Sequence, residues 1–311
     1  MSKLIRIGTR DSQLALWQAK TVQQQLDHLG YKTQLVPVKS TGDLVLDKPL
    51  YELGITGIFT KTLDIAMLNG DVDIAVHSMK DVPTLLPKGI VQSAVLKRAT
   101  GDDILVYKDL DFLNAEGTIA TGSLRRKAQW LHKYPSHKVE DLRGNVNTRL
   151  QKLEDNAWNA AIFAKAGLER INVLPKNYIA INWMVPAPAQ GAMVVVTLEN
   201  DAYCTEAVSK LNHQPSHICT HIEREFLRVL EGGCTAPIGA LATIEEQTVL
   251  FEGVLLSLDG KEKLVVKKEV EINDFKGFGK LCALEILNNG GKKLMENIKF
   301  DLKETKKGNE N

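Results

Sequence analysis

The sequence predicts an α/β protein of two lobes with mostly parallel sheets, followed by a small α+β domain. Strand-like and helix-like segments alternate from residue 3 to about 198, which is typical of parallel sheets because parallel strands need crossover connections. After residue 239, three strand-like runs follow one another without a helix, and this indicates an antiparallel sheet. With 311 residues, the chain is long enough for two or three such units.

The first lobe is predicted from segments near the N-terminus. Residues 4–8 predict a strand, and Asp11 or Ser12 caps the helix that follows, which ends at Gly30. The apolar side of this helix is expected to consist of Leu14, Trp17, Val22, Leu26 and Leu29. A strand at 33–38, a helix at 60–69 stopped at Gly70 and a buried strand at 73–76 complete the pattern.

The later segments follow the same logic. The second lobe is expected to hold strands at 104–107, 118–121, near Val139 and at 160–164, with helices opening at Ser123, Asn145 and Ala166. A strand at 194–198 precedes helices at about 201–211 and 217–231. The α+β domain is predicted from strands near 239–244, 249–257 and 263–271 and a helix at about 276–288. Residues 303–311 are expected to form a solvated, frayed tail.

The composition excludes several classes of protein. Hydrophobic residues make up 44% and charged residues 25%, which is ordinary for a globular protein and excludes collagen-like, disordered and disulfide-stapled chains. A net charge of +1 provides no overall attraction to nucleic acid or to an anionic membrane. No apolar run reaches the roughly 20 residues of a membrane span, and the N-terminus lacks a signal-peptide core. We therefore expect a cytoplasmic protein with no nucleic-acid or membrane partner.

The four cysteines, at positions 204, 219, 234 and 282, show no zinc-type spacing, so we expect no metal site and no disulfides. Cys234 differs from the others because two glycines precede it and a proline turn follows it. This setting predicts an accessible loop thiol. The thiol is either a covalent attachment point or a chance loop cysteine, and the pattern alone leaves both open.

Arginine is concentrated in one part of the chain. There are 29 lysines but only ten arginines, and five of these ten lie between residues 125 and 170. Arginine binds carboxylates in a planar, bidentate manner, so the cluster indicates an anion with several acidic groups. Arg125 and Arg126 fall in the first turn of the helix opened by Ser123, where the helix dipole disfavours a cation. Either a ligand anion binds there, or the pair is a solvated run on an exposed turn.

Other polar residues are expected at the same edge of the sheets. Arg143 and Arg149 bracket a strand-to-helix junction, and Arg10 follows the first strand. Ligands of open α/β sheets bind beyond the carboxyl ends of the strands. These arginines are therefore expected to converge on one cleft between the lobes, together with Ser12, His77, Ser78 and Ser123.

The run from His77 to Asp81 follows a buried strand and places a base, a hydroxyl, a cation and a carboxylate within five residues. A fixed carboxylate stabilises a cationic intermediate, so Asp81 is the candidate catalytic group. Simpler interpretations stay open: Asp81 starts a turn, Lys80 is a surface residue and His77 is a packed polar residue.

These residues occur together in ordered motifs. From residue 4 to 290 the chain closely resembles the porphobilinogen deaminase family, also called hydroxymethylbilane synthases. The motifs that carry the resemblance are Thr9-Arg10-Asp11-Ser12, Thr41-Gly42-Asp43, His77-Ser78-Met79-Lys80-Asp81-Val82-Pro83, Gly122-Ser123-Leu124-Arg125-Arg126, Leu142-Arg143-Gly144-Asn145-Val146 with Thr148-Arg149, Ala166-Gly167-Leu168 with Arg170, Gln190-Gly191-Ala192, and Glu231-Gly232-Gly233-Cys234.

The resemblance implies two lobes like those of periplasmic binding proteins, with crossings near residues 98 and 193, and a third domain. The expected boundaries are 1–97 with 193–211 for the lobe of the catalytic aspartate, 98–192 for the arginine-rich lobe, and 215–311 for the domain of the cofactor cysteine.

The resemblance also implies the chemistry. A dipyrromethane cofactor, joined to Cys234 by a thioether, primes the head-to-tail condensation of four porphobilinogen molecules with loss of ammonia. Water then releases the linear tetrapyrrole hydroxymethylbilane. The family further implies a monomer, whose product passes to uroporphyrinogen-III synthase.

Residue roles follow from the matching motif positions. The catalytic residues are Asp81, Lys80 and Arg10. The cofactor-binding residues are Cys234, Ser78, Lys80, Asp81, Thr121, Ser123, Arg125, Arg126, Arg143, Gly144 and Asn145. The substrate-binding residues are Arg10, Ser12, Phe59, Arg149, Arg170 and Gln190. Loss of ammonia leaves a cationic azafulvene, and a buried carboxylate at Asp81 is expected to stabilise its charge.

The chain departs from the family pattern at Thr56, Thr62, Asp102, Gly122 and Ala189. Many relatives carry Lys and Glu at the first two positions, Ser at Gly122 and Gly at Ala189. The alternative to a transferase is a two-lobed dicarboxylate-binding protein without catalysis. That alternative gives the Gly-Gly-Cys loop and the third domain no purpose.

Overall fold

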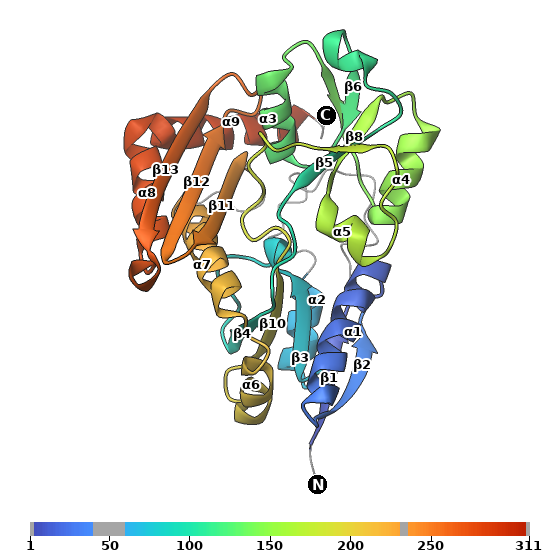
Figure 1. Cartoon of the computed structure of the whole chain (residues 1–311), viewed down its shortest axis with the longest axis vertical. Coiled ribbons are helices and arrows are strands. Elements are labelled where there is room, and N and C mark those ends of the chain that lie inside the picture. The colour runs from blue at the N-terminus through green and yellow to red at the C-terminus, as the bar shows by residue number, and fades with distance from the viewer. Residues whose placement is uncertain (1–2, 40–59, 231–235, 309–311) are drawn as a thin grey trace.

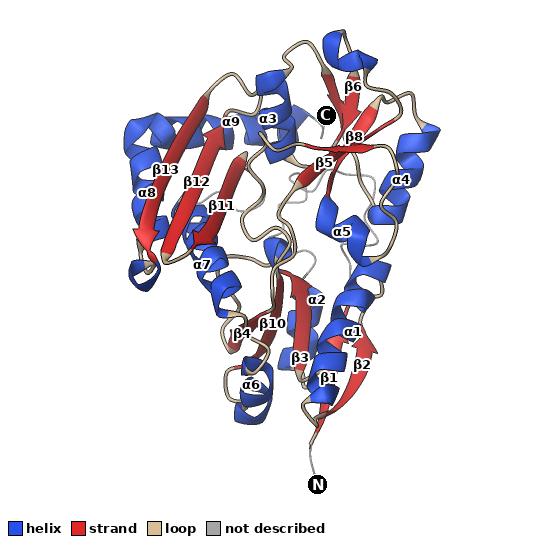
Figure 2. Cartoon of the chain, viewed as in Figure 1, coloured by secondary structure: helices blue, strands red, loops and turns tan. Residues whose placement is uncertain are grey.

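The computed structural model describes residues 3–39, 60–230 and 236–308, with side chains to residue 304. These residues form two five-stranded mixed sheets and one three-stranded antiparallel sheet, each packed against helices (Figure 1, Figure 2). The predicted fold class, two α/β lobes followed by an α+β part, is confirmed. The 41–43 motif, Thr56, Phe59 and Cys234 lie outside the described residues.

The first sheet has the strand order β2-β1-β3-β10-β4. Its strands are β1 (Leu4–Thr9), β2 (Lys32–Pro37), β3 (Ile74–Ser78), β4 (Ile90–Val95) and β10 (Met193–Leu198). β1 is parallel to β2 and β3, whereas β10 is antiparallel to both of its neighbours. The helices α1 (Gln13–His28) and α6 (Ala202–Ser209) pack on one face, and α2 (Lys61–Leu68) packs on the other.

The second sheet has the order β7-β6-β8-β5-β9. Its strands are β5 (Asp103–Tyr107), β6 (Thr118–Ala120), β7 (Lys138–Glu140), β8 (Ala160–Ala164) and β9 (Tyr178–Ala180). β6 is parallel to β7 and β8, and β5 is antiparallel to β8 and β9. The helices of this lobe are α3 (Leu124–Lys133), α4 (Val146–Asp155) and α5 (Lys165–Arg170).

The third sheet, β11 (Ile238–Glu245), β12 (Thr248–Leu256) and β13 (Lys263–Glu271), is a meander. Helices α7 (Gln214–Val229), α8 (Phe278–Ile286) and α9 (Lys292–Gly308) share a core with it, in which the rings of Phe226 and Phe251 lie 5.2 Å apart. Val254 and Leu256 pack against Ala128 of α3, so the sheet also contacts the second lobe.

The chain passes between the first two sheets twice, after Val95 and before Met193. The two crossings lie side by side, because Leu96 N donates to Met193 O at 3.1 Å and Ala99 N donates to Gly191 O at 3.2 Å. Gly191 has φ +84°, and a Cβ there would lie 2.4 Å from the carbonyl oxygen of Thr100. Only glycine fits this close approach.

Two sequence expectations about helices are wrong. Trp17 and Leu29 are 37% and 46% exposed, whereas Ala15 and Ala19 of α1 are buried, because small side chains let the helix approach the sheet. Residues 303–308 are not a frayed tail but the end of α9. This helix is stabilised by its apolar face, Leu294, Met295 and Ile298, which lies in the core of the third domain. Strands β4 and β9 were not predicted.

Among the described residues, no helix has the length and hydropathy needed to cross a bilayer.

Candidate functional site

The predicted site residues lie at the carboxyl ends of strands in both lobes. Arg10 follows β1, Ser78 ends β3 and Thr121 follows β6. Arg143 lies in the connection between β7 and α4. This is the edge at which ligands of open α/β sheets bind. The structure thus confirms the placement of these residues at strand ends.

Three helices begin at this edge, and each has a side-chain cap. Ser12 accepts from Ala15 N at 3.4 Å, and Asn145 accepts from Thr148 N at 3.0 Å. Ser123 accepts from the backbone N–H of Arg126 at 3.5 Å, and its own N–H donates to Thr121 Oγ1 at 3.3 Å. The sequence predicted all three caps, and they bring the positive ends of α1, α3 and α4 to the strand ends.

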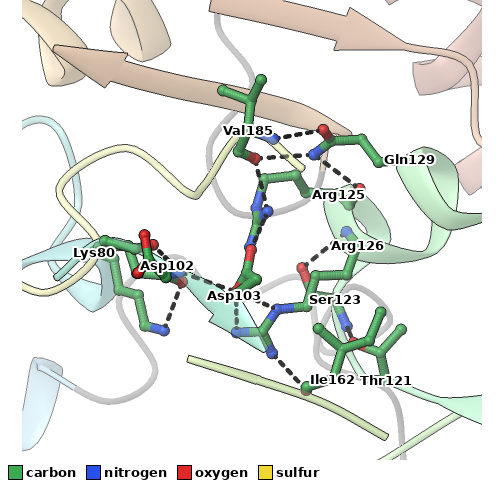
Figure 3. Close-up of polar contacts among 12 residues, drawn as sticks. Lys80, Asp102, Asp103, Thr121, Ser123, Arg125, Arg126, Gln129, Ile162 and Val185 are labelled. Carbon is green, nitrogen blue, oxygen red and sulfur yellow. Dashed lines mark hydrogen bonds and ion pairs between the residues drawn. The ribbon is translucent and has the colours of Figure 1, made fainter. Parts of the chain in front are cut away.

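Asp103, the first residue of β5, binds both arginines at the start of α3 (Figure 3). Its Oδ2 accepts from Arg125 Nη1 at 2.7 Å, and its Oδ1 accepts from Arg126 Nε and Nη2 at 3.0 and 2.7 Å. Arg125 Nη1 also donates to Val185 O at 2.8 Å, and Arg126 Nη1 donates to Ile162 O at 3.0 Å. Burial alone raises the pKa of the Asp103 carboxyl, but the charges of both arginines outweigh it and hold that pKa well below its usual range.

This arrangement changes the interpretation of the arginine pair. Arg125 and Arg126 are only 4% and 5% exposed, so they are not a solvated run. Their acidic partner within the protein is Asp103, which the sequence analysis did not name. One carboxylate offsets one of two positive charges, so the cluster keeps a net positive charge for a ligand. A role of these arginines toward a cofactor stays a prediction.

A signal for Asp103 was present in the sequence. Two arginines in a first helical turn, with no acid on that turn, require an anion from another element. Asp103 stands at the head of the apolar strand Ile104-Leu105-Val106, where a charge is costly without partners. The pairing spans more than twenty residues of sequence, so spacing alone did not reveal it.

Gln190 connects the two lobes through Lys80. Its side chain has no exposed surface, and Oε1 accepts from Lys80 Nζ at 3.2 Å. Its Nε2 donates to Gly101 O at 2.7 Å and to Asp103 Oδ1 at 2.9 Å. Because Gln190 is fully buried and both ends of its amide are already bound, the geometry favours a positioning role, and the predicted substrate contact stays a prediction.

Asp81 is the last residue of the 3₁₀ turn η2 (Met79–Asp81), and its side chain is exposed rather than buried as expected. Two cations lie within its electrostatic reach. Burial and the charge of Arg126 lower the pKa of Lys80 to about 8, an effect that Asp81 opposes. Burial and Arg126 likewise lower the pKa of Arg149 to about 10, again opposed by Asp81. The Asp81 carboxylate therefore interacts electrostatically with Lys80 of the first lobe and with Arg149 of the second.

Arg143 and Arg149 belong to the loop at the start of α4. Arg149 Nε donates to Gly144 O at 2.7 Å, and Gly144 has φ +114°. Arg143 is 6% exposed, and burial lowers its pKa. In the part of the chain that the structure describes, Arg143 Nη1 and Arg125 Nε are buried without a hydrogen-bond partner. A buried cationic donor without an acceptor indicates a place for an anion.

The remaining predicted residues have identified contacts. Burial and the charge of Arg10 lower the pKa of His77 to about 4, so this imidazole is neutral at pH 7 and packs in β3. Ser78 Oγ accepts from Gln18 Nε2 at 2.8 Å.

Arg170 lies where the arginine-rich lobe meets α1. Its Nη2 donates to Gly191 O at 2.7 Å, and its guanidinium lies 5.5 Å from the ring centre of Trp17. This contact gives the exposed Trp17 a partner in the second lobe. Cys234 and Phe59 cannot be placed in this way, as they lie outside the described residues.

Fold and site together define a two-lobed α/β protein whose cationic strand-end region suits a ligand with several carboxylates. Residues 5–206 match the family model described as "Porphobilinogen deaminase, dipyromethane cofactor binding domain". Residues 217–288 match the model "Porphobilinogen deaminase, C-terminal domain". The chain belongs to the porphobilinogen deaminase family.

Relatives match nearly the whole chain. The porphobilinogen deaminase of Moorella thermoacetica is 40% identical over 303 residues, which are 95% of this chain and 96% of the relative. Those of Pelotomaculum thermopropionicum and Campylobacter jejuni are each 41% identical, over 95% and 94% of this chain and 97% and 98% of their own.

Among solved structures, the chain can be aligned with two periplasmic proteins. They are the VFT2 domain of BvgS from Bordetella pertussis, with a TM-score of 0.42 and 12% identity over 67% of this chain and 86% of that one, and an arginine-transport binding protein from Legionella pneumophila, with a TM-score of 0.40 and 13% identity over 67% and 92%.

Family membership confirms the predicted transferase class and the dipyrromethane cofactor. The described residues fit such a cofactor. Each of its two pyrroles carries carboxylates, and the buried donors of Arg143 and Arg125 that have no acceptor are suited to them.

Proposed function

We propose that this chain is a hydroxymethylbilane synthase, which joins four porphobilinogen molecules head to tail with release of ammonia and then releases the linear tetrapyrrole. The observation that carries the proposal is the position of Asp81. Its carboxylate stands on a turn at the end of β3, beside Lys80 and within the field of Arg149 from the opposite lobe.

Cations of the second lobe hold the cofactor in this proposal. Arg143 and the Asp103-paired arginines Arg125 and Arg126 bind its carboxylates, with Lys80 contributing from the first lobe. The polar residues around them are Ser78, Asp81, Thr121, Ser123, Gly144 and Asn145. Once attached to Cys234, dipyrromethane supplies the pyrrole to which the first substrate is joined.

The incoming substrate carries an acetate and a propionate, and cations outside the cofactor set bind them. These are Arg10, Arg149 and Arg170, with Ser12 and Phe59 alongside. Gln190 acts through Lys80, because its fully buried amide binds Lys80 Nζ on one side and Gly101 O and Asp103 Oδ1 on the other. In this division of roles, Arg125, Arg126 and Arg143 bind carboxylates of the cofactor, and Arg10, Arg149 and Arg170 bind carboxylates of the substrate.

Asp81 stabilises the charge that develops on the substrate. When the C–N bond of the protonated aminomethyl group breaks, its electron pair leaves with nitrogen, which departs as ammonia, and the positive charge passes to the substrate pyrrole. A carboxylate about 4 Å away lowers the energy of that cation by about 4 kcal/mol at an effective dielectric of about 20. Because Asp81 is exposed in this structure, bound substrate is needed to exclude water from it.

Four further expectations belong to this proposal. The protein is a monomer in the cytoplasm, its product passes to uroporphyrinogen-III synthase, and its domains are 1–97 with 193–211, 98–192 and 215–311. The sheet composition supports these boundaries, since β10 rejoins the first sheet. Light scattering on the purified enzyme tests the monomer.

Steady-state kinetics of Asp81→Asn test the catalytic assignment. The variant keeps the shape of the side chain and removes its charge. We expect the holoenzyme to form with normal mass and kcat to fall by about 100-fold or more. A kcat near that of the wild type excludes Asp81 as the stabilising carboxylate.

Intact-protein mass spectrometry tests the attachment site. Wild type is expected to carry the mass of two pyrrole units, and Cys234→Ser to carry none. Cys219→Ser is the matched control, because Cys219 is buried in α7 and should leave the added mass unchanged. An unmodified wild-type chain with normal dicarboxylate binding would instead support a non-catalytic binding protein.

A further inference from the structure

Arg224 of α7 binds the turn that carries Asp81. Its Nη1 donates to Met79 O at 3.2 Å and to Val82 O at 2.9 Å, and its Nη2 donates to Pro83 O at 2.6 Å. These carbonyls lie on both sides of Lys80 and Asp81 in the chain. A helix of the C-terminal part thus holds the backbone of a turn in the first lobe.

The turn has few other backbone contacts among the described residues. Val82 N donates to Met79 O at 3.2 Å and Met79 N donates to Ala192 O at 3.0 Å, while Pro83 has no N–H. Arg224 therefore supplies donors for Val82 O and Pro83 O, which have no backbone donor among the described residues, and a second donor for Met79 O. A planar guanidinium fixes such acceptors in direction as well as distance.

Arg224 itself is held in a defined position. The neighbouring Glu223 has no exposed surface and accepts from Ala189 N at 2.6 Å and from Ala242 N at 2.8 Å. It also binds Arg98 Nη1 at 2.6 Å. This part of α7 is thereby fixed to both lobe crossings and to β11, so Arg224 projects from a rigid support.

The charge state of Arg224 suits this task. Burial and the nearby Arg228 lower its pKa only to about 10, so it remains a cation at neutral pH. Its hydrogen bonds within the described part of the chain all go to the 79–83 turn.

We propose that Arg224 is a positioning residue that fixes the orientation of Asp81 by holding the backbone of the 79–83 turn. The proposal rests on the assignment of Asp81 as the catalytic carboxylate. Displacement of a reacting group by about 1 Å can cost about 100-fold in rate, so a change at Arg224 acts on kcat without any contact between Arg224 and substrate.

A double-mutant cycle on the holoenzyme tests this. Arg224→Gln is expected to lower kcat by about 10- to 100-fold, with normal cofactor mass and KM within about threefold of wild type. In the Asp81→Asn background, the same substitution is expected to lower kcat less than about threefold further, because its effect passes through Asp81. Arg224→Lys, which keeps the charge, should recover part of the loss.

The matched control is Arg228→Gln, one turn later on α7 with an exposed side chain, which should retain wild-type kcat. Ile298→Val, a conservative change in the same domain's core, shows what lost stability alone does to kcat. If Arg224→Gln does not accumulate as folded holoenzyme, the cycle is run with Arg224→Lys. We expect this variant to show a smaller loss of kcat, and no further loss when it is combined with Asp81→Asn.

The outcomes separate the two proposals. The role of Arg224 is overturned if Arg224→Gln retains wild-type kcat. It is also overturned if the kcat of the double variant falls by the full product of the two single losses. Either result leaves the proposed function intact. Wild-type kcat in Asp81→Asn overturns the catalytic assignment itself.

Discussion

The carboxylate of Asp103 binds Arg126 through a single oxygen, Oδ1, which accepts from Nε at 3.0 Å and from Nη2 at 2.7 Å. The second oxygen, Oδ2, is thereby left for Arg125, which it binds at 2.7 Å. One buried acid thus fixes two guanidinium groups from consecutive positions of α3. Because a carboxylate of the protein itself holds both guanidinium groups in place, less conformational entropy is lost when they bind a ligand.

Asp103→Asn should destabilise the protein. Removing the charge leaves two buried arginines without an anion, which costs about 3–5 kcal/mol in comparable pairs. Urea unfolding at pH 7 measures the loss. Asp102→Asn is the control, because this neighbouring carboxylate is exposed and its loss should change the unfolding free energy by less than about 0.5 kcal/mol. Equal effects of the two substitutions would contradict the assignment.

The effect of Asp103→Asn should depend on pH. The pKa of Asp103 is lowered in the folded protein, so the unfolded chain takes up a proton first, near its ordinary value of about 3.9. The stabilisation is therefore fully present above about pH 5 and is lost progressively as the pH falls below 4. We expect the difference in unfolding free energy between wild type and variant to shrink in that range. If the difference in unfolding free energy between wild type and variant stays constant down to pH 3, Asp103 does not have a lowered pKa in the folded protein.

Lys80→Arg should extend cofactor loading to higher pH. Because the pKa of Lys80 is lowered to about 8, its positive charge is lost progressively as the pH rises through 8. An arginine stays charged there. We expect loading of the apo chain with porphobilinogen to slow above pH 8 in wild type and to stay fast up to about pH 9 in the variant. Mass spectrometry at timed intervals follows the loading. If the loading rates of wild type and variant fall in the same way above pH 8, Lys80 is not the cause of the fall.

Arg143→Leu should slow cofactor loading without lowering the stability of the apo chain. Because Arg143 Nη1 is buried without an acceptor, its removal is expected to leave the unfolding free energy of the apo chain unchanged or about 1 kcal/mol higher. Loss of a charge-assisted hydrogen bond to a ligand carboxylate should slow cofactor loading by about tenfold or more. Lys138→Gln, which removes a positive charge from an exposed position on β7, should change neither quantity. Normal loading in Arg143→Leu would remove this residue from the cofactor site.

Ala189→Gly should stabilise the protein slightly. Ala189 has φ +61°, a conformation that costs an L-residue about 1–2 kcal/mol, and glycine recovers part of this after its own entropy cost. We expect the unfolding free energy to rise by about 0.5 kcal/mol. Ala192→Gly, close by without a positive φ, should lower it. A decrease in both variants would show that no strain resides at Ala189.

Local sequence signals predicted the order of the elements well. The caps Ser12, Ser123 and Asn145 each begin the helix expected of them, and the strand at 160–164 has the predicted bounds. These signals depend on hydrogen bonds within a few residues, so a single stretch of sequence contains them. The burial of Ala19 in place of Trp17 depended instead on how closely α1 packs on the sheet, which periodicity does not specify.

The candidate site was predicted less completely than the fold. The arginine distribution and the run from His77 to Asp81 predicted the arginines and Asp81, and Gln190 was expected at the substrate, but the protein partners that hold these side chains were missed. Asp103, Gln190 and Arg224 each act on residues of another element, up to 145 positions away in the chain. Such pairings are decided by the tertiary arrangement, and no spacing rule in one sequence reports them.

The crossings between the lobes are paired by the hydrogen bonds Leu96–Met193 and Ala99–Gly191. Two hydrogen-bonded segments resist twisting more than a single linker does, whereas hinge bending between lobes remains open to them. We therefore expect a lengthening pyrrole chain to be accommodated by a widening angle between the lobes rather than by rotation of one lobe against the other.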